Sequence, residues 1–324
     1  MVLLPAILPF GVTGTRGGIR EEFLAFTGGV VMEPLWDSLL VPVGERVLPL
    51  LIWLVGLTAV FVPLEMLFAV HPHSPVRRQW LVDLGYYFLN SLIAATLVAI
   101  PLSVLTMTLR GQLSAAWLAG IEGWPVWLWL LAGLVVSETG YYWGHRLSHQ
   151  IPWLWRFHAI HHSAAELDYL VNTRAHPLDM VFSRLCALAP LYGLGLGSPV
   201  QLEGSLLPIV ISVLGTCWGF FVHANLRWRF GLLEWLVATP AFHHWHHTRT
   251  GPLDRNFSST LPLLDAVFGT LHLPREFPID YGVEATLPET LVDQMLYPLV
   301  PELTTGGTQR LAPDVPLADC HQTG

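Results

Sequence analysis

Long uncharged stretches constrain what this chain can fold into more than any other feature. No charged residue occurs from Val47 to Leu64, and 26 further uncharged residues lie between Asp83 and Arg110. An apolar helix of about 20 residues is long enough to cross the hydrocarbon core of a bilayer. Charged residues make up 12% of the chain, against about 25% in ordinary soluble proteins. The pattern predicts an all-α integral membrane protein with the lipid bilayer as its surroundings.

We expect about three transmembrane helices followed by a helical hairpin. The first two helices are the uncharged stretches above, and a third apolar run begins near Trp124 and leads directly into His145. Two more uncharged runs follow, 185–202 and 204–226, and they are broken by Gly193, Gly195, Gly197 and Pro199. Such residues favour a turn, so the two runs are predicted to pair as a hairpin that spans the membrane or dips into it.

The chain divides into three parts by composition. Residues 1–45 form a Gly-rich N-terminal arm, residues 46–297 the membrane-embedded domain, and residues 298–324 a tail rich in Thr, Gly and Pro that is predicted to be disordered. With the predicted spans, one side of the membrane receives most arginines, and the loop after the second span holds only Arg110. By the positive-inside rule the side with most arginines, which also holds the histidines, is cytoplasmic. Its arginines are Arg77, Arg78, Arg146, Arg156, Arg174, Arg227 and Arg229.

Histidines are concentrated in three short motifs. On a helix, residues at i, i+3 and i+4 share one face, so each motif is predicted to direct its rings to one side. His244 lies on another face and is left out of this set. The remaining rings number eight, and because one metal ion rarely takes more than three or four protein ligands, eight imidazoles fit a pair of ions. The motifs are His145-x3-His149, His158-x2-His161-His162 and His243-x2-His246-His247.

Several other functions are disfavoured by the sequence. The net charge is −8 and the basic residues form no run, so a nucleic-acid partner is not expected. The three cysteines are far apart and form no C-x-x-C pair, which excludes a thiolate metal site of that kind. No H-E-x-x-H motif occurs, which disfavours a zinc hydrolase. The chemistry of the chain is therefore expected at the histidine motifs.

The three motifs beside apolar helices resemble those of the fatty acid hydroxylase and sterol desaturase superfamily, which are integral membrane di-iron oxygenases. The resemblance covers roughly Leu81 to Leu273, and the eight residues between His149 and His158 suit the hydroxylase branch better than the acyl desaturases. Further similar segments are Tyr141-Tyr142-Trp143-Gly144, Trp155-Arg156-Phe157, Arg174-Ala175-His176-Pro177, His223-Ala224-Asn225, Asp254-Arg255-Asn256-Phe257 and Leu264-Asp265-Ala266-Val267-Phe268-Gly269-Thr270.

The resemblance implies two iron ions, which zinc can replace in purified protein, and O2 as co-substrate. It implies His223 as a further ligand, and it places four more residues at the metals or beside the ligands: His176, Glu138, Asp254 and Asn256. The implied substrate is a lipid, such as a sterol or an acyl chain. No Rossmann fingerprint or haem domain is visible, so an external ferredoxin- or cytochrome-type donor would supply electrons. The implied metal ligands in the motifs are His145, His149, His158, His161, His162, His243, His246 and His247.

A divalent-metal transporter or metal-binding membrane protein could use the same histidines. Transporters place their ligands near the bilayer midplane on broken helices, often within internal repeats. Here the motifs follow the ends of apolar runs on one side, and no repeat is visible. This arrangement favours the enzyme. Hydroxylation and desaturation both begin with hydrogen abstraction from a C–H bond, and the sequence leaves both open.

Overall fold

The structure is a computed structural model that describes residues 43–72, 77–110, 112–196 and 217–300, and most of these residues are helical. Within these ranges the one β contact is an isolated antiparallel bridge between Thr248 and Tyr281. The predicted all-α class is therefore confirmed for the described part of the chain. The predicted arm 1–45 and tail 298–324 lie almost wholly outside the described residues.

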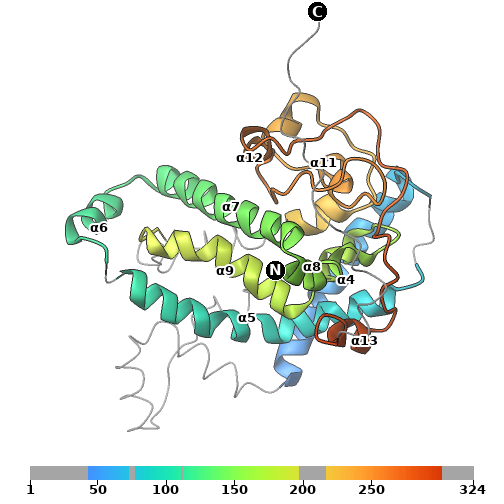
Figure 1. Cartoon of the computed structure of the whole chain (residues 1–324), viewed down its shortest axis with the longest axis horizontal. Helices are drawn as coiled ribbons and strands as arrows, with labels where there is room; N and C mark the ends of the chain where they lie inside the picture. The colour runs from blue at the N-terminus through green and yellow to red at the C-terminus, as the bar shows by residue number, and fades with distance from the viewer. Residues whose placement is uncertain (1–42, 73–76, 111, 197–216, 301–324) are drawn as a thin grey trace, which may run out of the picture.

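Three long helices form the body of the molecule. They are α5 (Trp80–Arg110), α7 (Val126–Gln150) and α9 (Pro177–Gly193), which pack side by side (Figure 1). The short helix α6 (Ala115–Glu122) connects α5 to α7 at one end. The backbones of α7 and α9 approach closely because Gly140 and Gly144 carry no side chain; a Cβ at Gly140 would lie 2.1 Å from the Cys186 carbonyl oxygen. Small residues four apart permit such close helix packing.

One described helix is long and apolar enough to cross a membrane alone, namely α4 (Val43–Phe68), over Val47–Phe68. A second candidate exists if α6 and α7 form one span, although their axes are bent by 114°. The second predicted span coincides with α5, and part of the predicted hairpin, 197–216, lies outside the described residues. The number of spans, their orientation and the cytoplasmic position of the histidines stay predictions.

Short helices gather at the opposite end of the bundle from α6 and make a cap (Figure 1). The third apolar run ends there, and it is one continuous helix into the first histidine motif, as predicted: α7 runs through His145 and His149. The helix α13 (Leu291–Leu296) packs against α5. The other elements of the cap are α8 (Pro152–His158), η1 (His161–Ser163), η2 (Tyr169–Thr173), η4 (Gly231–Trp235), α11 (Pro240–His246) and α12 (Pro262–Val267).

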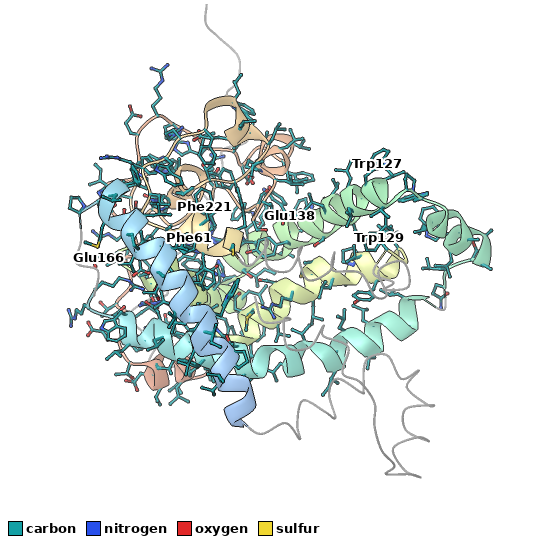
Figure 2. The ribbon with its side chains drawn as sticks, turned by 180° about the vertical axis from the view of Figure 1, so that it is seen from behind. Phe61, Trp127, Trp129, Glu138, Glu166 and Phe221 are labelled. Carbon is teal, nitrogen blue, oxygen red and sulfur yellow. The ribbon has the colours of Figure 1, made fainter. Side chains whose placement is uncertain are left out.

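The helix α4 is fastened to the cap by apolar and polar contacts. Phe61 stacks on Tyr169 with 5.5 Å between ring centroids, and Phe221 packs against the same cluster. The Glu65 carboxylate accepts the backbone N–H groups of Tyr169, at 2.8 Å, and of Asn225, at 3.0 Å. In Figure 2, Phe61 and Phe221 lie near the cap, whereas Trp127 and Trp129 lie toward the far end of α7. The candidate membrane span therefore leads directly to the histidine-bearing end of the molecule.

Candidate metal centre

The structure brings nine histidines into two compact groups that lie side by side in the cap. Within each group, one ring nitrogen from every histidine lies within 4.8 Å of the others. The ring centroids of His162 in the first group and His247 in the second are 4.4 Å apart. We call them group A, which contains His145, His149, His158, His162 and His246, and group B, which contains His161, His223, His243 and His247.

Backbone carbonyls fix the tautomer of four of these rings. The Nδ1 atom of His145 lies 2.7 Å from Phe257 O, and that of His246 lies 2.8 Å from Arg255 O. In group B, Nδ1 of His161 lies 2.9 Å from Arg174 O, and Nδ1 of His223 lies 2.7 Å from Gly219 O. A carbonyl oxygen only accepts hydrogen bonds, so each Nδ1 must carry the proton. Each neutral ring then presents an unprotonated Nε2 to the centre of its group.

The Nε2 atoms of neighbouring rings face one another at short distances. In group B, His161 Nε2 lies 3.3 Å from His223 Nε2, although both rings hold their proton at Nδ1. Two lone pairs at this distance repel each other and make no hydrogen bond. The other explanation, a proton on one ring, is disfavoured because burial, reinforced by His158, lowers the pKa of His161 to about 4. A cation between the nitrogens accounts for the arrangement.

The donor set therefore fits metal ions. Burial, reinforced by neighbouring imidazoles, holds the pKa of His162, His243, His246 and His247 well below the usual 6.5, so these rings are neutral at pH 7. Within the described residues His246 Nε2 is buried and has no hydrogen-bond partner, as expected of a nitrogen that binds a metal ion. Neutral imidazoles suit iron, zinc and copper, and the two groups have room for one ion each.

The prediction that each motif directs its rings to one side is wrong for the second and third motifs. The second motif does not lie on one helix, because α8 ends at His158 and a separate turn of 3-10 helix begins at His161. His158 and His162 join group A, while His161 joins group B. In the third motif His246 joins group A, whereas the other two rings join group B. Neighbouring residues point in different directions around a helix, so both motifs contribute to both groups.

Four residues were expected at the metals or beside the ligands, and of these four Asp254 contacts a histidine ring of the two groups. The Asp254 carboxylate lies 3.0 Å from Nδ1 of His149. Glu138 instead accepts hydrogen bonds from the Thr260 backbone N–H and from the hydroxyls of Ser259 and Thr260, and so holds the loop before α12. Asn256 donates to the carbonyls of Phe242 and His272. Its amide ties α11 to the following loop.

His176 and His244 lie outside both groups. His176 accepts a hydrogen bond from the Leu178 N–H through Nδ1 and so caps α9. His244 lies 3.0 Å from Ala224 O through Nε2 and 2.9 Å from the Tyr281 hydroxyl through Nδ1. Both nitrogens of His244 therefore serve packing within the cap.

Sequence reasoning missed Asp179, whose Oδ2 lies 2.9 Å from Nδ1 of the group A ligand candidate His158. Asp179 lies in the first turn of α9, two residues after Pro177, a position where an acidic residue is ordinary because it complements the helix dipole. Nothing in the local sequence distinguishes this carboxylate from a simple helix-start residue. Its role follows only from the packing of α9 beside α7 and α8.

Comparison with known proteins identifies the part of the chain that carries the site. The fatty acid hydroxylase family model matches residues 130–270. The ornithine lipid hydroxylase OlsE of Rhizobium tropici is 34% identical over 180 residues, which are 55% of this chain and 52% of that protein. Human alkylglycerol monooxygenase is 29% identical over 161 residues, which are 48% of this chain and 33% of the relative.

Methylsterol monooxygenase 2-2 of Arabidopsis thaliana is 30% identical over 144 residues, or 44% of this chain and 51% of that protein. The chain thus spans about half, or less, of the curated relatives it matches. No solved structure gives a significant match. The matched region contains all nine histidines of groups A and B. The region from residue 130 to residue 270 therefore belongs to the fatty acid hydroxylase family, as the histidine motifs and their surroundings indicated.

Proposed function

We propose that this protein is a membrane-bound, O2-dependent oxidoreductase that uses two iron ions to hydroxylate or desaturate a lipid. The observation that carries the proposal is the pair of buried imidazole groups whose Nε2 atoms converge. Group A would hold one iron and group B the other. The proposed ligands are His145, His149, His158, His162 and His246 for the first iron, and His161, His223, His243 and His247 for the second.

Residues around the rings would hold this site in its binding geometry. Four backbone carbonyls accept hydrogen bonds from the protonated Nδ1 atoms and leave each Nε2 free to bind the metal. They belong to Phe257, Arg255, Arg174 and Gly219. The carboxylate of Asp179 does the same for His158 and adds negative charge, which makes the ring a stronger donor. The rings are thus oriented before a metal arrives.

The side chains of the cap cannot break an aliphatic C–H bond by acid–base chemistry. Iron with O2 would supply that chemistry. The protein contributes by excluding water. All five rings of group A and three of the four in group B are buried. A dry site protects a reactive oxidant from side reactions and strengthens the electrostatic contacts within it.

A lipid is the substrate class that fits the surroundings. The relatives' names specify an ornithine lipid, an alkylglycerol and a methylsterol as their substrates or substrate classes. In this chain α4 exposes large apolar side chains such as Leu48, Ile52 and Met66 along its length and packs against the cap at Phe61. A lipid could therefore approach the metals laterally from the bilayer. Electrons would come from an external ferredoxin- or cytochrome-type protein on the cytoplasmic side.

The proposal is tested by metal analysis and Mössbauer spectroscopy on protein grown with iron-57 and purified in mild detergent. We expect two coupled irons per chain that are oxidised by O2 after reduction, followed by incorporation of oxygen or a double bond in a lipid screen. One metal per chain, or two that stay redox-silent after reconstitution with iron, would overturn the proposal. That result would favour the alternative function, a divalent-metal transporter or metal-binding membrane protein.

A further inference from the structure

Four charged side chains are buried together behind group B, although the chain has few charged residues. Arg77 and Arg174 alternate with Asp83 and Asp168, and their side chains are at most 9% exposed. Arg174 Nε lies 2.5 Å from Asp83 Oδ1, Arg77 also contacts Asp83, and Arg77 Nε lies 2.5 Å from Asp168 Oδ2. Removing charged groups from water is costly even when they are paired. A network of this kind calls for a reason beyond packing.

Arg174 connects this network to the metal-binding turn at two points. Its carbonyl accepts the Nδ1 proton of His161 at 2.9 Å, and its guanidinium donates to the Ser163 hydroxyl at 3.2 Å. The same guanidinium donates to Gln79 Oε1 at 2.6 Å. Burial lowers the pKa of Arg174 to about 10, so it remains charged at pH 7. Arg174 therefore contacts both the first and the last residue of the turn from His161 to Ser163.

Asp83, in the first turn of α5, holds Arg174 in this position. Besides its ion pairs, its backbone carbonyl accepts the Thr173 hydroxyl at 2.9 Å. About two turns further along α5, Asn90 donates to the carbonyls of Thr173 and Ala175, which flank Arg174. The start of a long helix thus fixes the backbone whose carbonyl orients His161.

We infer that Asp83 is a positioning residue for the group B metal: through Arg174 it sets the direction and tautomer of His161, without touching the metal itself. This inference rests on the proposed two-metal function. It is selective, because the Nδ1 contacts of group A lie elsewhere, on Phe257, Arg255, Asp254 and Asp179. Loss of Asp83 should therefore weaken the group B metal more than the group A metal, to which this turn contributes only His162.

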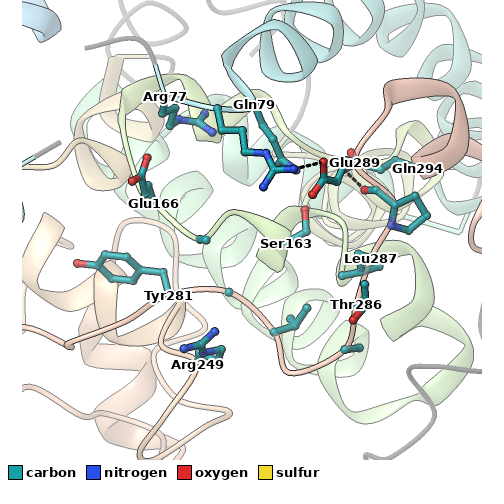
Figure 3. Close-up of a pocket in the computed structure, with 16 residues that line it drawn as sticks. Arg77, Gln79, Ser163, Glu166, Arg249, Tyr281, Thr286, Leu287, Glu289 and Gln294 are labelled. Carbon is teal, nitrogen blue, oxygen red and sulfur yellow. Dashed lines mark hydrogen bonds and ion pairs between the residues drawn. The ribbon is translucent and has the colours of Figure 1, made fainter. Parts of the chain in front are cut away.

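The outer side of this network faces solvent. Arg77, Gln79 and Ser163 line a hollow of about 500 Å³ whose opposite wall includes Tyr281 and Leu287 (Figure 3). Truncating Gln79 would leave space that water can fill while Arg174 keeps its ion pair with Asp83. Gln79→Ala is therefore a mild variant that perturbs the same link without breaking the buried charge pairs.

The experiment compares four variants of the full-length protein in detergent, each loaded with two equivalents of iron-57 and titrated with a chelator. They are Asp83→Asn, Gln79→Ala, Asp179→Asn and, as a control, Asp280→Asn, whose carboxylate pairs with exposed Arg249. Metal content and the two Mössbauer components are followed separately. Partners that orient a metal-binding imidazole typically contribute about 10–100-fold to metal affinity.

We expect Asp83→Asn to weaken one component by about 10-fold or more, Gln79→Ala to weaken the same component less, and Asp179→Asn to weaken the other component. Asp280→Asn should match the wild type. Equal retention of both irons in Asp83→Asn, or loss of the same component in Asp83→Asn and Asp179→Asn, would overturn the inference. If Asp83→Asn does not fold, Gln79→Ala decides: no selective weakening there refutes the inference. Fewer than two irons in the wild type would instead refute the proposed function.

Discussion

Replacing Gly140 by alanine should damage group A through the packing of two helices. The added Cβ would lie 2.1 Å from the Cys186 carbonyl oxygen on α9, and ordinary contact begins at 3.4 Å. Because the obstacle is backbone, α7 and α9 must separate by roughly 1 Å. Overpacking of this kind costs about 1–3 kcal/mol of stability. The larger effect concerns the site, since α7 carries His145 and His149.

Both histidines on α7 belong to group A, and group B takes no ring from this helix. A misplacement of about 1 Å from a distant substitution can cost on the order of 100-fold in rate. We therefore expect Gly140→Ala to retain its helical circular dichroism, to lose one iron selectively, and to lose at least about 100-fold in lipid turnover. Iron content, the two Mössbauer components and product formation measure these effects.

The matched control is Gly133→Ala on the same face of the same helix. There a Cβ would meet only the Leu191 side chain, at 3.5 Å, which is ordinary contact. Alanine also favours an α-helix over glycine by about 1 kcal/mol, so this variant should be as stable as the wild type or more so. If Gly140→Ala kept both irons and turned over lipid within about two-fold of the control, the argument from helix spacing would be wrong.

Three further predictions follow from the site and the topology. His161→Ala and His246→Ala, which remove one ring from each group, should each abolish O2-dependent turnover while membrane insertion persists; full activity in either would contradict the two-iron assignment. Cysteines placed at Arg146 and Arg255 should be labelled only from the cytoplasmic side, and labelling from outside would reverse the predicted orientation. Metal-free protein should lose stability in acid, because burial lowers the pKa of His161 to about 4 and of His244 to about 3. The unfolded chain, with histidine pKa near about 6.5, binds these protons first, so the stability present above about pH 6.5 declines toward about pH 4; equal melting midpoints at about pH 7.5 and about pH 5 would contradict this.

The helical class could be predicted from the sequence, and the histidine motifs could be recognised in it, because both depend on local patterns. A run such as Val47–Leu64 is recognisable from its lack of charge alone, and α4 covers it. The continuous helix from the third apolar run into His145 was predicted for the same reason and is confirmed.

The division of the rings between two groups could not be predicted, because it depends on where α8 ends and how the following turn is oriented. The residues that anchor the rings were hidden for a related reason. Asp179 and the carbonyl of Arg174 contact His158 and His161 only once the chain has folded. Glu138 shows the converse, since an acidic residue near a metal motif suggested a role at the metals, yet it binds the loop at Ser259 and Thr260.

The consecutive residues His161 and His162 serve different groups, and this has a consequence for engineering. Their Cα atoms are separated by a single trans peptide unit of about 3.8 Å. The dipeptide therefore limits how far apart the two binding sites can lie. An inserted residue, or a substitution that rotates this peptide, would disturb both sites at once. Efforts to change one metal site while sparing the other should therefore begin at ligands outside this dipeptide, such as His149 in group A or His223 in group B.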